Sequence, residues 1–136
     1  MEIQGLDEFT KTLENAQDNY KKEAKKLLNE IGMKLKTRVV LKTPVDTGVL
    51  RRSWKYKTIN ENEGILSNSV HYASHIEYGH RTRGGKSFVD GVYMLEKSVK
   101  EIETELDKEF SIMIDNLFKE KVGYYDNLQR YFIFDY

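Results

Sequence analysis

The chain has 136 residues, of which 39% are hydrophobic and 32% are charged, and its formal net charge at pH 7 is zero. This length and composition predict one soluble domain that is large enough to bury a single core. The sequence has no cysteine, which excludes disulfides and thiolate metal sites. It opens without a basic flank or an apolar run, and no segment is apolar for the length of a bilayer, so we expect neither a signal peptide nor a membrane partner.

The charges are unevenly distributed along the chain. Residues 1–59 carry 13 Lys and Arg against 8 Asp and Glu, whereas residues 60–136 carry 9 against 14. One interpretation is that these charges only solvate helix faces. The other is a polar molecule that stacks head to tail, basic surface on acidic surface, as a ring subunit could.

The first third of the sequence predicts helices. Apolar residues recur every three or four positions, which is the helical period; they are Leu6, Phe9, Leu13, Ala16, Tyr20, Ala24, Leu27, Leu28, Ile31, Leu35 and Val39. Asp18 and Asn19 favour a kink or break near residues 17–20. Gly32 lowers helix stability by about 1 kcal/mol relative to alanine, and we expect it to mark the close approach of another backbone.

A short segment that holds the only proline and the only tryptophan ends the helical pattern. Pro44 disfavours helical backbone at Thr43, and Gly48 adopts positive φ at little cost within a predicted turn. We predict a rigid helix-to-sheet corner made by Pro44, Asp46, Thr47, Gly48, Leu50, Arg51 and Trp54.

From Ser53 the period changes to two, which predicts a strand with Trp54, Tyr56 and Thr58 on one face. Residues 60–64 form a turn and residues 65–68 the returning strand of a hairpin. Residues 70–78 suit either a third strand or a turn followed by a helix from Ala73. Residues 79–91 contain four glycines and no hydrophobic period, and are predicted as a mobile loop.

A long helix is predicted near the C-terminus. Its narrow apolar seam consists of Leu95, Val99, Ile102, Leu106, Phe110, Met113 and Leu117, and we expect it to pack on the sheet rather than in a coiled coil. Residues 123–136 include six aromatic side chains. This aromatic segment either folds back on its own domain or docks on a neighbour as an added strand.

Together these patterns predict an α+β fold, in which N-terminal helices and a long C-terminal helix pack on a small, mostly antiparallel sheet of three to four strands. The predicted domain spans residues 1–118, and residues 119–136 form an aromatic C-terminal extension.

The sequence offers few residues for chemistry. His71, His75 and His80, together with Glu77, could form a two-histidine, one-carboxylate metal site, but surface or hydrogen-bonding roles are the preferred interpretation. No nucleophile motif and no P-loop spacing is present. We therefore predict no catalytic residue, no metal and no cofactor.

The corner segment from Thr43 to Trp54 resembles the hallmark of the tail-completion family of long-tailed bacteriophages and prophages, also called minor tail components or head–tail joining proteins. A second stretch, from His71 to Gly79, fits the same family in order and spacing. The resemblance covers roughly residues 5–118. This sequence departs from the family in having Ser87 to Gly91 where a proline is usual, and in continuing past the last helix.

The resemblance implies a non-catalytic structural protein of the virion, made in the host cytoplasm and located at the phage neck. Such a subunit would form a ring, as a hexamer, between the head connector and the tail-tube or tail-terminator proteins, and it could be a monomer when alone. DNA would make passing contact at most. The expected assembly interface consists of Tyr72, Glu77, Tyr78, Gly79, Arg81, Arg83, Lys86, Tyr131, Phe132 and Phe134.

A nucleic-acid-binding or metal-dependent nuclease-like module is the alternative. It would use His71, His75 and His80 with a basic patch. The patch would consist of Arg51, Arg52, Arg81, Arg83 and Lys86. The zero net charge argues against tight DNA binding. A prophage-encoded toxin or regulator is a third option that no sequence feature supports.

Overall fold

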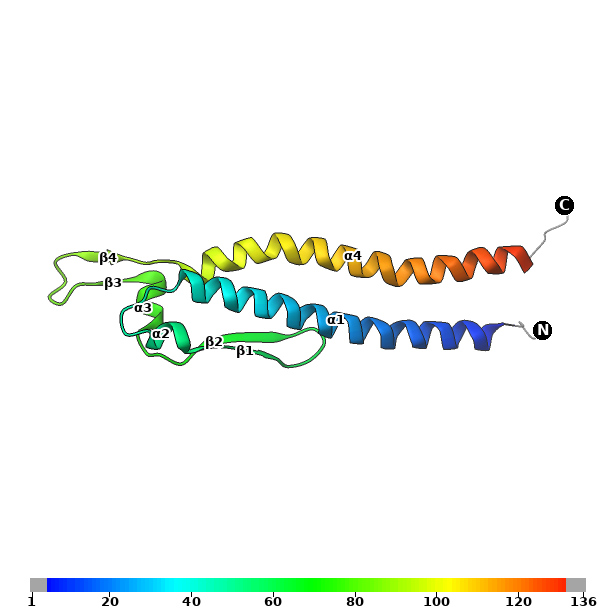
Figure 1. Ribbon diagram of the computed structural model, residues 1–136, viewed down its shortest axis with the longest axis horizontal. Coiled ribbons are helices and arrows are strands. Elements are labelled where there is room, and N and C mark those ends of the chain that lie inside the picture. Colours follow the sequence, from blue (N-terminus) through cyan, green and yellow to red (C-terminus); the bar gives the residue numbers. More distant parts are fainter. Residues whose placement is uncertain (1–4, 132–136) are drawn as a thin grey trace.

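A computed structural model describes residues 5–131, with side chains as far as Leu117. The elements are α1 (Leu6–Lys42), α2 (Val49–Arg52), β1 (Trp54–Thr58), β2 (Gly64–Asn68), α3 (Ala73–Tyr78), β3 (Gly79–Arg81), β4 (Phe88–Asp90) and α4 (Met94–Tyr131). The molecule is elongated: α1 and α4 run antiparallel along its length, and the smaller elements gather at one end and along α1 (Figure 1). The predicted α+β class is confirmed.

Helix α1 is continuous over 37 residues, so the kink or break expected near residues 17–20 was wrong. Asp18 and Asn19 are exposed, and each lowers helix stability by only about 0.5 kcal/mol relative to alanine. No proline lies near them to remove a backbone hydrogen bond, and no glycine lies near them to add conformational freedom. The helix ends at Lys42, and Thr43 is extended at φ −73° and ψ 123°, as the following proline predicts.

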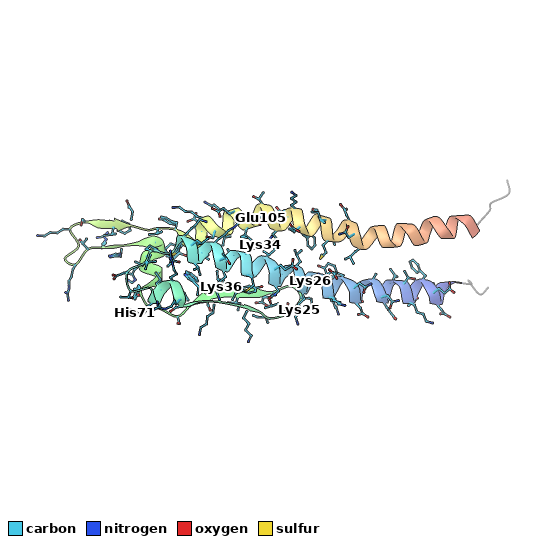
Figure 2. All side chains as sticks on the ribbon, viewed as in Figure 1. Lys25, Lys26, Lys34, Lys36, His71 and Glu105 are labelled. Carbon is cyan, nitrogen blue, oxygen red and sulfur yellow. The ribbon has the colours of Figure 1, made fainter. Side chains whose placement is uncertain are left out.

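Helix α4 packs on α1, not on a sheet as predicted. Ile102 and Met113 are buried along this contact, whereas Phe110 is 42% exposed. Carboxylates of α4 pair with cations of α1 across the two helices: Glu105 with Arg38 and Lys34, and Glu101 with Lys42 and Arg38. Lys34 and Glu105 lie on the facing sides of the two helices (Figure 2). Part of the charge asymmetry along the sequence is therefore neutralised inside the subunit.

The β1–β2 hairpin packs on α1, on the side away from α4 (Figure 1). The two strands form the predicted hairpin, with Trp54 paired with Asn68 and Thr58 with Gly64. Strand β2 begins at Gly64, one residue earlier than predicted. The Tyr56 ring lies directly over Gly32, where a Cβ atom would overlap it. Its hydroxyl donates to the Leu28 carbonyl oxygen at 3.0 Å. Gly32 therefore allows the close approach of the Tyr56 side chain, whereas the sequence predicted the approach of another backbone.

The four described strands form two separate two-stranded antiparallel sheets. Residues 70–78 adopt the second of the two predicted conformations, a turn followed by α3. Residues 79–91, predicted as a loop, instead form the β3–β4 hairpin, in which Arg81 pairs with Phe88. The turn of this hairpin closes through Thr82, whose N–H donates to the Ser87 carbonyl oxygen at 2.9 Å.

The core lies where the corner, the first hairpin and the start of α4 meet. Val39, Leu50, Trp54 and Met94 are buried there, and partly buried residues from β2, α3 and the link to α4 surround them. Helix α4 continues to Tyr131, past residue 118, where the sequence predicted that the last helix ends. In the described part of the chain, no helix is both long enough and apolar enough to cross a membrane.

Candidate assembly interface

The corner is held by one buried hydroxyl group. Thr43, which is 1% exposed, donates from Oγ1 to the Val39 carbonyl oxygen at 2.6 Å. The Thr43 Oγ1 in turn accepts a hydrogen bond from the indole N–H of Trp54 at 2.9 Å. Because Thr43 is the residue after α1 and Trp54 is the first of β1, this pair of hydrogen bonds fixes the angle between helix and strand.

A guanidinium group closes the turn from the other side. Gly48 adopts φ 79° at the start of α2, which is the turn conformation that the sequence predicted. Arg51, in α2, donates to the Thr43 carbonyl oxygen at 3.1 Å. Its Nε is buried and has no hydrogen-bond partner among the described residues. The predicted corner residues thus lie together, with Leu50 and Trp54 inside and Pro44, Asp46 and Thr47 on the surface.

The two segments that carry the family resemblance meet at one groove. The corner residues from Pro44 to Gly48 form one wall, and His71, Tyr72, His75, Ile76 and His80 form the other. The groove, which we call the corner groove, has a volume of about 580 Å³. Sequence alone placed these segments 20 residues or more apart, and α3 brings them together.

The three histidines line the corner groove without forming a metal site. The rings of His75 and His80 lie 5.8 Å apart, centroid to centroid, and His71 stacks edge-on against Tyr72 at 5.2 Å. Within residues 5–117, no three His, Asp or Glu side chains come together as possible metal ligands. His80 Nδ1 is buried, and no described residue forms a hydrogen bond with it.

Glu77, predicted as an interface residue, is not on the surface. It is 5% exposed, and its carboxylate accepts the backbone N–H groups of Leu95 at 2.9 Å and Glu96 at 3.0 Å. These groups lie in the first turn of α4, where no intrahelical acceptor is available and negative charge is favoured. The Glu77 backbone carbonyl also accepts the N–H of Tyr93 at 3.1 Å. Glu77 therefore joins α3 to the start of α4.

Five of the remaining predicted interface residues lie on the β3–β4 hairpin or at its base: Tyr78, Gly79, Arg81, Arg83 and Lys86. This hairpin projects beyond the body (Figure 1). Arg81, Arg83 and Lys86 are exposed, and Tyr78, at the base, is 63% exposed. Tyr72 is half-buried against the core. Gly79 begins β3 at φ 85°, and a Cβ there would overlap the Val89 carbonyl oxygen. The side chain of Tyr131, and Phe132 and Phe134 altogether, lie outside the described residues.

Sequence reasoning missed two apolar residues on the same hairpin. Phe88 is 57% exposed and Val89 is 46% exposed. The signal was present in the sequence. Phe88 and Val89 are the only apolar residues in a segment of otherwise polar, charged and glycine residues, and no core-facing period explains them.

Comparison with protein families supplies the identification. A family model described as "Bacteriophage HK97-gp10, putative tail-component" matches residues 7–79, which is more than half of the chain and runs from α1 through the corner to the start of β3. No curated protein matches the chain, and no solved structure does. The protein is a bacteriophage tail component, and so a structural part of the virion. It belongs to the HK97-gp10-like family.

Proposed function

We propose that this tail component is a non-catalytic, ring-forming tail-completion subunit at the phage neck, joining the head connector to the tail tube. The ring is a hexamer in this proposal. One observation supports it most strongly. The two segments that resemble the tail-completion family meet at the corner groove, in a chain that belongs to a family of phage tail components. The corner groove and the projecting hairpin are the surfaces that neighbours would contact.

The division of the molecule into a rigid body and a projecting arm supports this role. The corner is held by buried hydrogen bonds and α4 by the buried carboxylate of Glu77. In contrast, the β3–β4 hairpin has only two strands, and an isolated two-stranded hairpin is marginally stable in water. In a substantial minority of complexes a segment gains order when it contacts a partner, and the hairpin would do so in the ring.

The test is a phage carrying Arg81→Ala with Arg83→Ala. Both side chains are exposed, and neither forms an ion pair with any described residue. We expect the purified variant to melt within about 2 °C of the wild type, because surface substitutions change stability by about 0.5 kcal/mol or less. Electron microscopy of lysates should show filled heads and separate tails.

The matched control is Lys55→Ala with Lys57→Ala. Like the two arginines, these residues are exposed cations two positions apart in the sequence, but they lie on the outer face of β1. This variant should yield joined, infectious particles. Normal particles from the arginine variant would refute the proposed role of the hairpin end in joining.

A further inference from the structure

The β3–β4 hairpin presents a face that is both basic and apolar. Residues paired across an antiparallel ladder point to the same face, so Arg81 and Phe88 lie together on one side of the hairpin. Arg83 and Lys86 follow in the turn, and Asp90 is the only acidic residue between Gly79 and Gly91. With Phe88 57% exposed, this face is an unusual one to leave in water.

A complementary groove lies on α4 of the same chain. Its lining includes the apolar side chains of Leu95 and Val99. The other lining residues are Glu77, Tyr78, Glu96, Lys100 and Glu103. This α4 groove has a volume of about 420 Å³. Glu103 is exposed and forms no ion pair with any described residue.

The α4 groove is net negative even though Lys100 is among the residues that line it. Lys100 pairs with Glu96 at 2.9 Å across one helical turn. Its pKa is raised, chiefly by the hydrogen bond to Glu96 and by the charges of Glu96 and Glu103. One exposed cation beside two exposed carboxylates leaves this part of α4 with a net negative charge.

The β3–β4 hairpin of one chain projects away from α4 of the same chain (Figure 1). The two complementary surfaces therefore cannot meet within a subunit, but they can meet between two copies. Such a contact is heterologous, because each copy contributes a different surface, and repetition of it closes a ring when the rotation between copies permits.

We infer that the β3–β4 hairpin of one copy docks in the α4 groove of the next, with Phe88 over Leu95 and Val99 and the hairpin cations against Glu96 and Glu103. This contact rests on the proposed ring and specifies which surfaces build it. The corner groove is left free for a different neighbour.

The absence of native cysteine makes a direct test possible. Lys86→Cys places a thiol in the hairpin turn, Lys100→Cys places one in the α4 groove, and Lys55→Cys places a control thiol on the outer face of β1. All three replace an exposed lysine of the full-length chain. A short bis-maleimide is added to pairwise mixtures at protein concentrations up to about 1 mM, which reveals contacts with millimolar Kd.

The mixture of Lys86→Cys with Lys100→Cys should yield crosslinked dimers, at least tenfold more than Lys86→Cys alone or with Lys55→Cys. A chain with both Lys86→Cys and Lys100→Cys should give a ladder whose largest species counts the subunits. Absence of crosslinks, or equal yield with Lys55→Cys, would overturn the inference.

A charge exchange tests the chemistry of the contact. Arg81→Glu is added to the Lys86→Cys chain, and Glu103→Lys to the Lys100→Cys chain. Either change alone should lower the yield of crosslinked dimer about tenfold, because like charges that face each other across an interface repel. The two together should restore it. Failure of the pair to restore the yield would overturn the proposed pairing of these charges.

The same variants separate this contact from the neck function. If crosslinking fails but Arg81→Ala with Arg83→Ala still blocks head–tail joining, the contact is wrong and the neck role stands. If the crosslinks form as expected and that phage makes normal particles, the contact stands and the neck role falls.

Discussion

The buried carboxylate of Glu77 gives the sharpest prediction of stability. Glu77→Gln keeps the size of the side chain but removes its charge and replaces one acceptor oxygen by an amide group. Of the two bonds to the backbone N–H groups of Leu95 and Glu96, one is lost and the other is no longer charge-assisted. A hydrogen bond to a charged group contributes about 1.5–3 kcal/mol and a helix cap about 1 kcal/mol. We therefore expect a loss of about 2 kcal/mol, and about 3 kcal/mol for Glu77→Ala.

Thermal unfolding followed by circular dichroism measures this loss. For a domain of this size, about 2 kcal/mol corresponds to a decrease in Tm of about 7 °C. Glu103→Gln is the control, since it removes a carboxylate from the same helix at an exposed position, and it should change Tm by less than about 2 °C. If Glu77→Gln and Glu103→Gln have the same Tm, the Glu77 carboxylate does not stabilise the start of α4.

Three further predictions concern the body of the subunit. Thr43→Val leaves the Trp54 indole N–H without its acceptor and should lower the free energy of unfolding, measured in urea, by about 1–3 kcal/mol. Thr43→Ser keeps the hydroxyl group and should retain most of the stability. Equal losses for the two variants would show that the hydroxyl group does not stabilise the corner. Gly32→Ala places a methyl group into the Tyr56 ring and should destabilise by about 1–3 kcal/mol, despite the better helix propensity of alanine; a more stable variant would contradict this packing. The pKa of Glu105 is lowered, chiefly by its hydrogen bond to Arg38, so its stabilising contribution is present above pH 4.5 and is lost as the pH falls through its lower folded-state value. The difference in Tm between wild type and Glu105→Gln should accordingly shrink on acidification from pH 7 to pH 3; a difference that grows would reverse the sign of the argument.

Local signals in the sequence predicted the features that depend on local backbone preference. Pro44 and Gly48 determine the corner through the conformations they favour, and the alternation from Trp54 to Thr58 determined which face of β1 is buried. The expected break near Asp18 failed for the opposite reason. A helix is cooperative, and two weak local penalties do not offset the hydrogen bonds on either side.

Predictions that depended on which elements of the chain pack against each other were less successful. The apolar seam of α4 indicated that the helix has a buried face, but its period carries no information on whether a helix or a sheet covers that face. The hairpin from Gly79 to Asp90 was predicted as a loop because strands of three residues are too short to show alternation. Glu77 was placed on the surface because burial of a carboxylate depends on the helix start that it caps, and that helix begins 17 residues later.

The unbroken α1 has a mechanical consequence. With 37 residues it is about 55 Å long, and its last turn forms part of the corner while its first turns lie at the opposite end of the molecule (Figure 1). A rotation of about 10° at the corner would therefore move the far end of this lever by about 10 Å. If a neighbour contacts the corner as proposed, small rotations there would become large displacements at the far end of α1, and a spectroscopic label near Phe9 would report them.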